Sequence, residues 1–419
     1  MSYYTLFRQR LAASVPTSTT DWNIRYLYLE IVFASVLGGI VSFHSAFAIR
    51  LGASQDLVAW LSAAPALIAA IGSIPSARFF AHRRRRKLWL FGSLLLVRAG
   101  YGVAGLMPLL FPANAAFWFV LWIVALNLPS IFFTNGFNAL LGELVPEQRR
   151  AFVFSRRSII YSIGVVLVTA LAGVWLDHVP FPENYRIMYA FGFVVALGSQ
   201  YYLHRLTVPD QDAPLPSKQA VTATTEHVTL SPAMRRMLFN TALYQFGLTL
   251  PGALFNILYI NTLKVSDGWI GLNSSAASAG VIVGYLVWER MLRRHTFVWG
   301  QQRASLLTWI FPFVLSLSSN LNVIMLANFA VNLMHPGFDL SSFNVLLKLS
   351  RPEHRTTYIS WYNTVVNGSN FLGPIVGAWL AGYVGIPAVL MLSAMLRLSG
   401  GILFNVKRVE VPVEPVPAH

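Results

Sequence analysis

The chain has 419 residues, of which 55% are hydrophobic and only 11% are charged. A soluble globular domain carries about 25% charged residues, so this composition excludes one. It also excludes a disordered chain, which is poor in aromatic residues, and an outer-membrane barrel, whose apolar segments are short and alternating. The chain has no cysteine, which excludes disulfides and thiol chemistry. A helical protein that crosses a membrane many times is the class that remains.

Apolar runs long enough to cross a bilayer, which takes roughly 20 mostly apolar residues in a helix, occur twelve times along the chain. They lie near residues 27–49, 57–80, 88–111, 115–142, 152–177, 187–204, 237–263, 268–290, 299–318, 321–347, 357–382 and 385–406. The sequence therefore predicts an all-α polytopic membrane protein with twelve transmembrane helices.

The basic residues lie almost entirely on one side of these predicted spans. Arg98 and Arg397 fall within spans, and Arg50, Arg186 and Lys264 lie on one side; the rest of the 31 lysines and arginines lie on the other, together with both termini. Because basic loops stay in the cytoplasm, we expect both termini to be cytoplasmic, in a bacterial-type inner or plasma membrane with membrane lipids around it. Topology accounts for the net charge of +15, so we expect no nucleic-acid partner.

A sequence motif recurs in the two halves of the chain. Phe-Asn-Ala-Leu-Leu at 137–141, with Pro-Glu-Gln-Arg at 146–149, reappears as Phe-Asn-Val-Leu-Leu at 343–347 with Pro-Glu-His-Arg at 352–355. Repeated halves are common in transporters. The repeat predicts a division of the chain into five parts. These are a cytoplasmic N-terminal segment (1–26), a six-helix half (27–206), a cytoplasmic linker (207–234), a second six-helix half (235–406) and a cytoplasmic tail (407–419).

Two six-helix copies in the same orientation, with Pro-Glu-x-Arg turns after spans 4 and 10 and short basic loops after spans 2 and 8, resemble the major facilitator superfamily over essentially the whole chain. Members typically carry Gly-x-x-x-Asp-Arg-x-Gly-Arg-Arg/Lys after span 2. The aligned stretch, residues 78–87, keeps only the basic end of that motif. The resemblance implies an MFS-like fold, a small-molecule substrate, alternating access, and a pathway lined by spans 1, 4, 7 and 10.

Three ionisable side chains are candidates for proton coupling. Asp339 lies nine residues before Lys348, or roughly 13 Å into span 10, and His335 is four residues earlier on the same helical face. Charge inside hydrocarbon is costly, so a carboxylate at that depth is a candidate proton carrier. The alternative is a structural acid that caps the helix or pairs with an arginine. Glu30, near the start of span 1 and close to Arg25, is the third candidate, and its alternative is a solvated interfacial acid.

Further polar side chains inside spans have two interpretations. Arg98 and Arg397 are intramembrane charges for which we expect a structural partner more than a substrate. Neutral amides bind a polar solute, or they bond to neighbouring helices. The candidate substrate-binding residues are Asn135, Asn138, Gln245, Asn256, Asn363, Asn367 and Asn370, the last three of which share one helical stripe.

The sequence contains no phosphate-binding loop, no zinc-protease motif and no nucleophile elbow, so we expect no enzyme activity, no metal and no cofactor. The favoured function is secondary active transport of a small organic solute by alternating access, coupled to protons. Few fixed charges in the pathway favour a neutral, amphiphilic or cationic solute over a multivalent anion, with efflux of hydrophobic compounds slightly ahead of sugar uptake. The alternative is a transport-silent protein of the same fold that acts as a receptor or lipid scramblase.

Overall fold

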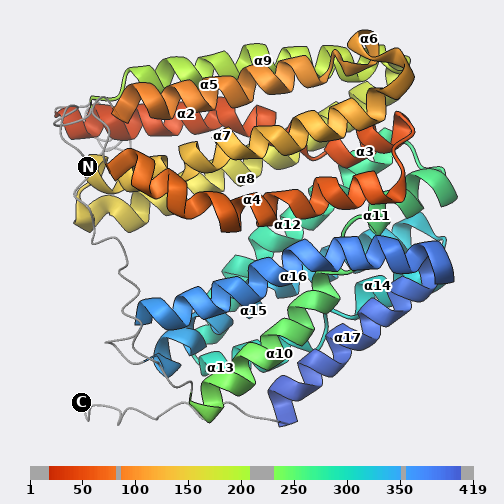
Figure 1. Ribbon diagram of the computed structural model, residues 1–419. Coiled ribbons are helices and arrows are strands. Elements are labelled where there is room, and N and C mark those ends of the chain that lie inside the picture. The colour runs from red at the N-terminus through yellow and green to blue at the C-terminus, as the bar shows by residue number, and fades with distance from the viewer. Residues whose placement is uncertain (1–17, 82–85, 208–230, 351–354, 407–419) are drawn as a thin grey trace, which may run out of the picture.

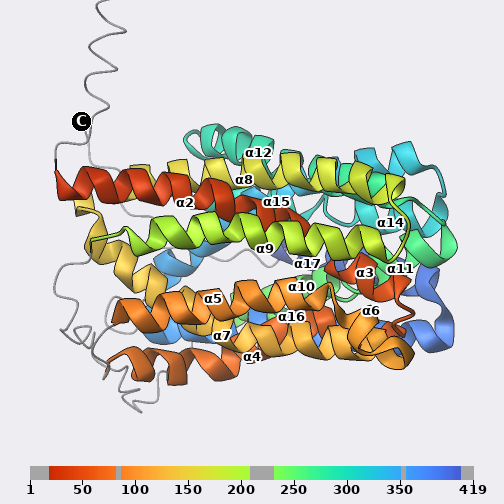
Figure 2. The same cartoon turned by 90° about the horizontal axis from the view of Figure 1, so that it is seen from above.

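The computed structural model describes residues 18–81, 86–207, 231–350 and 355–406. Helices account for nearly all of these residues, and no strand occurs among them. The helices run roughly along one common axis and form two bundles, one from each half of the chain (Figures 1 and 2). This arrangement confirms the predicted all-helical fold of two repeated halves.

Six segments cross the first bundle. They are α2 (Thr19–Val41) continued by α3 (His44–Arg50), α4 (Gln55–Ala81), α5 (Arg86–Ala104), α7 (Ala115–Leu144), α8 (Glu147–His178) and α9 (Glu183–His204). The short α6 (Met107–Leu110) and η1 (Pro112–Asn114) join α5 to α7.

Six more segments cross the second bundle. They are α10 (Pro232–Thr249) continued by α11 (Leu254–Ile257) and the π-helical η2 (Leu258–Thr262), α12 (Asp267–Leu292), α13 (Phe297–Ser305) continued by α14 (Ile310–Leu317), α15 (Leu321–Leu349), α16 (Arg355–Val384) and α17 (Ile386–Val406). Eight segments of the described chain are long and apolar enough to cross a membrane by length and composition. The other four are α5, α9, the broken α13–α14 pair and α16.

Side-chain caps fix several helix starts in the second half. The hydroxyl of Ser266 accepts a hydrogen bond from the backbone N–H of Trp269, and the hydroxyl of Thr296 accepts one from Trp299. Such caps satisfy backbone N–H groups that have no partner within the helix. They explain why α12 and α13 begin where they do.

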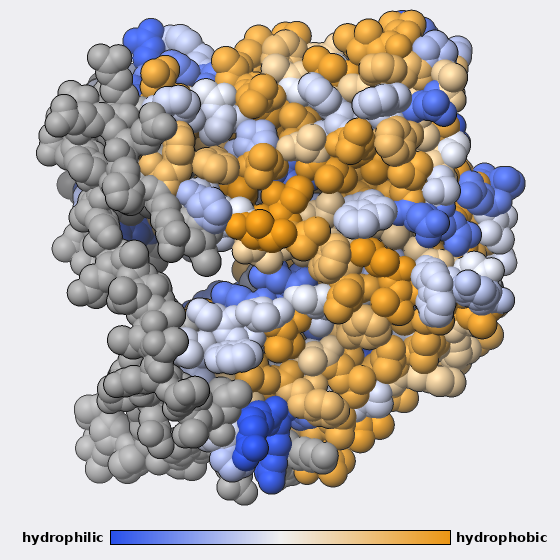
Figure 3. All heavy atoms as spheres, in the orientation of Figure 1, coloured by the Kyte–Doolittle hydropathy of each residue, from blue (hydrophilic) through white to orange (hydrophobic). Residues whose placement is uncertain are grey.

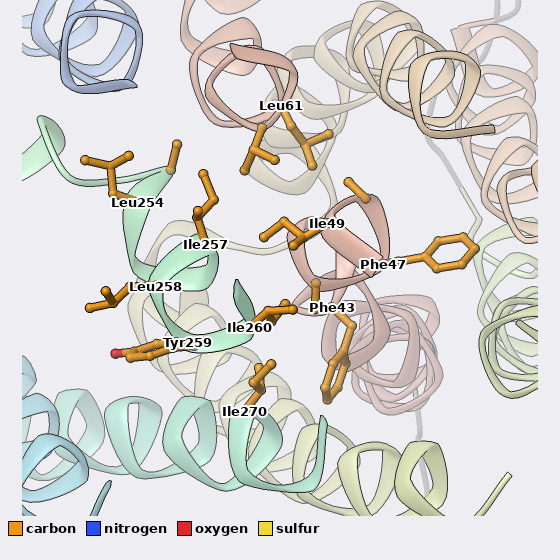
Figure 4. Close-up of a cluster of buried hydrophobic side chains, with 14 of the residues drawn as sticks. Phe43, Phe47, Ile49, Leu61, Leu254, Ile257, Leu258, Tyr259, Ile260 and Ile270 are labelled. Carbon is orange, nitrogen blue, oxygen red and sulfur yellow. The ribbon is translucent and has the colours of Figure 1, made fainter. Parts of the chain in front are cut away.

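The two halves meet along two helix pairs and at one end of the molecule. Helix α8 packs against α12, and α4 packs against α16. At the end that carries Arg50, which we call the closed end, α3 also packs against α11 and η2. There, side chains of both halves form one core, in which Ile49 and Leu61 face Ile257, and Phe43 lies beside Ile270 (Figure 4).

At the other end, where α2 begins and α17 ends, the halves have separate cores. One cluster there, around Leu27 and Phe91, belongs wholly to the first half, and another, around Met237 and Leu346, belongs wholly to the second. Figure 3 shows a hollow between the halves on this side, bordered partly by hydrophilic residues. We call this end the open end, because no core shared by the two halves closes it among the described residues.

Small residues let α8 and α12 approach closely. A Cβ atom on Gly271 would meet the carbonyl oxygen of Thr169 at 2.6 Å and the Cα of Gly173 at 3.1 Å. The Ser275 hydroxyl donates to the Val166 carbonyl at 2.9 Å across the same pair of helices. Close backbone approach through small residues, with polar bonds added, is a common way for helices to associate in membranes.

Candidate functional site

Asp339 of α15 is the candidate acid of the second half. It is close enough to interact electrostatically with Tyr244 of α10, Tyr285 of α12 and Tyr362 of α16. Asp339 is exposed, and it forms no ion pair or hydrogen bond within the described residues. The charge of this acid thus has no partner among the described residues.

His335 lies one helical turn away, in a different setting. It lines a cavity of about 300 Å³ inside the second half, which Asp339 does not line. The cavity's polar lining also includes Asn256, Asn332 and Arg397. No hydrogen bond joins His335 to Asp339 in the part of the chain that the structure describes. The cavity therefore gathers three residues singled out from the sequence: His335, Asn256 and Arg397.

Arg397 is buried beside this cavity and is held by backbone carbonyls. Its Nε donates to Gly247 at 3.2 Å, its Nη2 to Leu248 at 3.1 Å and its Nη1 to Thr308 at 3.1 Å. The first two carbonyls belong to the last turn of α10, and the third lies in the break between α13 and α14. These bonds fix the guanidinium in place, since such carbonyls lack their usual helical partners.

Glu30 and Arg98 meet in a buried polar network of the first half. The carboxylate of Glu30 is 2.7 Å from Arg157 and 3.8 Å from Arg98, and it accepts a hydrogen bond from Ser199 at 2.8 Å. Arg98 also donates to Gln200 at 2.7 Å. The charge of Glu30 is thus paired with two guanidinium groups.

This network corrects one expectation. Glu30 was expected beside Arg25 at the start of span 1, but it lies eleven residues into α2 and is buried, and Arg25 packs over the ring of Trp22. The role of Arg157 was not predicted from the sequence: it turns inward from α8 and pairs with Glu30. Packing of α2 against α8 and α9 brings these partners together.

Several predicted substrate-binding amides bond to other helices. Asn135 of α7 donates to the Ser76 hydroxyl of α4 at 2.6 Å. Gln245 of α10 donates to the side-chain oxygen of Asn370 on α16 at 3.1 Å. Asn363 and Asn367 form no hydrogen bond within the described residues, and both are at least partly accessible. The stripe on α16 is therefore divided between a helix contact and two free amides.

Some expectations fall outside the described structure. The side chain of Asn138 is not among the described ones, nor is most of the basic motif at 78–87 or the Pro-Glu-His-Arg turn at 352–355. The same holds for most of the N-terminal segment, the linker and the tail, although α10 already begins at Pro232.

An ion pair between the halves was not anticipated from the sequence. Arg50, the last residue of α3, lies 2.9 Å from the carboxylate of Asp267, the first residue of α12. The backbone N–H of the next residue, Gly268, donates to Asp177 of α8 at 3.0 Å. In the sequence, Arg50 is only one of three basic residues on its side of the membrane.

The described residues contain no group of three or more His, Cys, Asp or Glu side chains that could hold a metal.

The fold and these polar features define a membrane transporter built from two six-helix halves, closed at one end and open at the other. The chain belongs to the Major Facilitator Superfamily, whose family model matches residues 27–241 and 237–418. As a member, it is a transporter that works by alternating access, in which the two ends open in turn.

Solved structures with the same fold cover nearly the whole chain. A bacterial homologue of the human lysosomal transporter Spinster, in an inward-facing and occupied conformation, is similar with a TM-score of 0.70 and 13% identity over 94% of this chain and 98% of that one. A variant of the nucleoside transporter NupG is similar with a TM-score of 0.71 and 12% identity, over 92% of this chain and 100% of that one. The xylose transporter XylE from E. coli, in an inward-open conformation, is similar with a TM-score of 0.64 and 12% identity, over 92% of this chain and 94% of that one. No curated protein matches the chain significantly in sequence.

Proposed function

We propose that the protein is a secondary active transporter of a small organic solute and that Asp339 couples solute movement to protons. The observation that carries this proposal is the unpaired carboxylate of Asp339. It is exposed within the membrane-spanning helix α15 and forms no ion pair or hydrogen bond within the described residues, although it is close enough to tyrosines of α10, α12 and α16 to interact with them electrostatically. An ionisable group in such a place is expensive to keep and is a functional candidate by default.

The other candidate acid supports this choice by contrast. Glu30 has two guanidinium partners and a hydroxyl donor, whereas Asp339 has none of these within the described residues. Removing a proton carrier from its cationic partners costs several kcal/mol, as in any buried ion pair. Asp339 therefore carries the proton in this proposal, and Glu30 holds the first half together.

In this proposal, Asp339 is reached from the open end. With cytoplasmic termini, as the basic loops predict, the hollow faces the cytoplasm, and we propose that the proton reaches Asp339 from that side. Efflux, which the sequence favours slightly, remains the direction that we propose.

The test uses purified protein in liposomes with a pH-sensing dye in the lumen and a panel of drugs and sugars added in turn. We expect solute-driven proton movement in the unmodified protein, and Asp339→Asn should abolish it while leaving solute exchange between the two sides. Asp56→Asn is the matched control, because Asp56 is an exposed acid in the first turn of α4 at the closed end.

Proton movement that survives Asp339→Asn would overturn the role of Asp339. If no compound moved in either form, transport itself would be contradicted, and a receptor or lipid scramblase of the same fold would become the better hypothesis.

A further inference from the structure

The two halves each bury an arginine, but only one of the two has an acidic partner. Arg98 and Arg397 are both 3% exposed. Arg98 lies in the network with Glu30. No carboxylate lies within ion-pair distance of Arg397 in the described part of the chain. Burying a charge without a counter-charge is costly, so the contrast needs an explanation.

The carbonyls that hold Arg397 do not neutralise it. Gly247, Leu248 and Thr308 each accept one hydrogen bond from Arg397, and a guanidinium has five N–H groups. Two N–H groups are therefore left over, and Arg397 lines the cavity of about 300 Å³. The three carbonyls hold the guanidinium in place, and its positive charge has no counter-charge within the described residues.

The remainder of the cavity wall has a polar and an apolar part. His335, Asn256 and Asn332 are polar, and neither His335 nor Asn256 forms a hydrogen bond within the described residues. Phe255 and Phe311 pack at 5.1 Å between ring centroids and form an aromatic wall. Sites for small ligands commonly combine an apolar wall with a few placed polar groups.

We infer that this cavity binds a small organic monoanion, with its anionic group against Arg397 and His335 and its apolar body against Phe255 and Phe311. Arg397 is the one lysine or arginine among the residues that line the cavity, so a single negative charge matches it. Guanidinium groups bind carboxylates and other oxyanions through paired N–H groups. This inference deepens the proposed function by naming a class of solute, and it replaces the expectation of a neutral or cationic one.

The test measures binding to the full chain purified in detergent, by calorimetry. The probes are benzoate, its neutral analogue benzamide and its cationic counterpart benzylamine, with benzenesulfonate and octanoate as alternative anions. We expect at least one of the anions to bind and benzoate to bind at least ten-fold more tightly than benzamide. Equal binding of benzoate and benzamide, or no binding of any of the three anions at 10 mM, would overturn the inference.

Two variants locate the site. Arg397→Gln should remove the preference for anions. Because Arg397 also bonds to three carbonyls, that variant is prone to misfold, and Asn256→Asp provides a second route. Asn256→Asp introduces a negative charge into the cavity on a side chain of nearly the same shape, so it should weaken benzoate binding at least ten-fold. Asn322→Asp is the matched control, because Asn322 is exposed on α15 outside the cavity. Unchanged benzoate binding in Asn256→Asp would place the anion elsewhere and overturn the inference.

The same probes in liposomes separate this inference from the proposed function. Anion binding without anion movement would leave the site intact and contradict transport. Movement of neutral solutes by a protein that binds none of the anions would leave transport intact and contradict the site.

Discussion

Arg50 and Asp267 form the salt bridge that joins the two halves at the closed end, with 2.9 Å between the guanidinium and the carboxylate. Arg50 also donates to the Val265 carbonyl at 3.3 Å, so it holds the segment just before α12. Its side chain is 27% exposed and that of Asp267 only 5%. Since the closed end must open during alternating access, this pair has to break in every cycle.

Arg50→Gln should therefore shift the protein toward the state that is open at the Arg50 end. Charge-assisted hydrogen bonds contribute roughly 1.5–3 kcal/mol each, which corresponds to about a 10- to 150-fold change in the balance of the two states. Because the chain has no cysteine, spin labels can be placed on two introduced cysteines, Tyr201→Cys and Arg290→Cys. The distance between them, measured by pulsed electron resonance, should shorten as the open end closes.

An exposed ion pair provides the control for Arg50→Gln. Arg293 and Glu289 lie 2.6 Å apart, and their side chains are 74% and 59% exposed. Such pairs contribute little, so Arg293→Gln should leave the label distance unchanged. An unchanged distance in Arg50→Gln as well would show that the apolar core of the closed end, not the ion pair, holds the halves together.

Glu30→Gln should destabilise the first half, because Arg98 and Arg157 would lose their shared carboxylate. Breaking a buried ion pair costs about 3–5 kcal/mol, and the partial exposure of Arg157 places the expected loss at the lower end. A denaturant titration of the protein in detergent measures this loss as a change in the free energy of unfolding. Asp21→Asn breaks the more exposed pair of Asp21 with Arg149 and should cost less than about 1 kcal/mol. A stable Glu30→Gln protein that had lost proton coupling would instead make Glu30 the proton carrier.

The sequence was sufficient to predict the helices, because hydrocarbon requires long apolar segments. It was not sufficient to predict which side chains meet. Glu30 is five residues from Arg25 in the chain, but its partners Arg98 and Arg157 come from α5 and α8. Helix packing decides these pairs, and periodicity carries no information about it.

The contacts between the halves could likewise not be predicted from the sequence. Asp267 follows the capping residue Ser266 at the start of a predicted span, and Arg50 ends another on the same side of the membrane. Opposite charges on one side are the only signal for the pair. The cavity was missed for a similar reason: His335, Asn256 and Arg397 were each noted, but they lie on different helices, and only the fold brings them to one wall.

The α8–α12 crossing provides a test of packing. Gly271→Ala places a methyl group against the Thr169 carbonyl and the Gly173 backbone, neither of which is a flexible side chain. We expect a loss of about 1–3 kcal/mol from overpacking. Gly382→Ala is the matched control, since nothing lies within 4 Å of its added carbon, and a helical Gly→Ala change there should be neutral or stabilise by up to about 1 kcal/mol. Equal unfolding curves for the two variants would contradict the close approach.

The bond between Gln245 and Asn370 separates the two interpretations of the intramembrane amides. If it serves to join α10 and α16, Gln245→Leu and Asn370→Leu should show a coupling of about 0.6 kcal/mol in a double-mutant cycle of unfolding, since hydrogen bonds between membrane helices average that value. Gln245→Leu with Asn363→Leu is the control cycle and should be additive, because Asn363 forms no hydrogen bond within the described residues. If Gln245 instead binds the solute, the cycle shows no coupling and Gln245→Leu alone lowers solute affinity. Because unfolding and solute affinity are measured separately, the role of Gln245 in holding the helices can be distinguished from a role in selecting the solute.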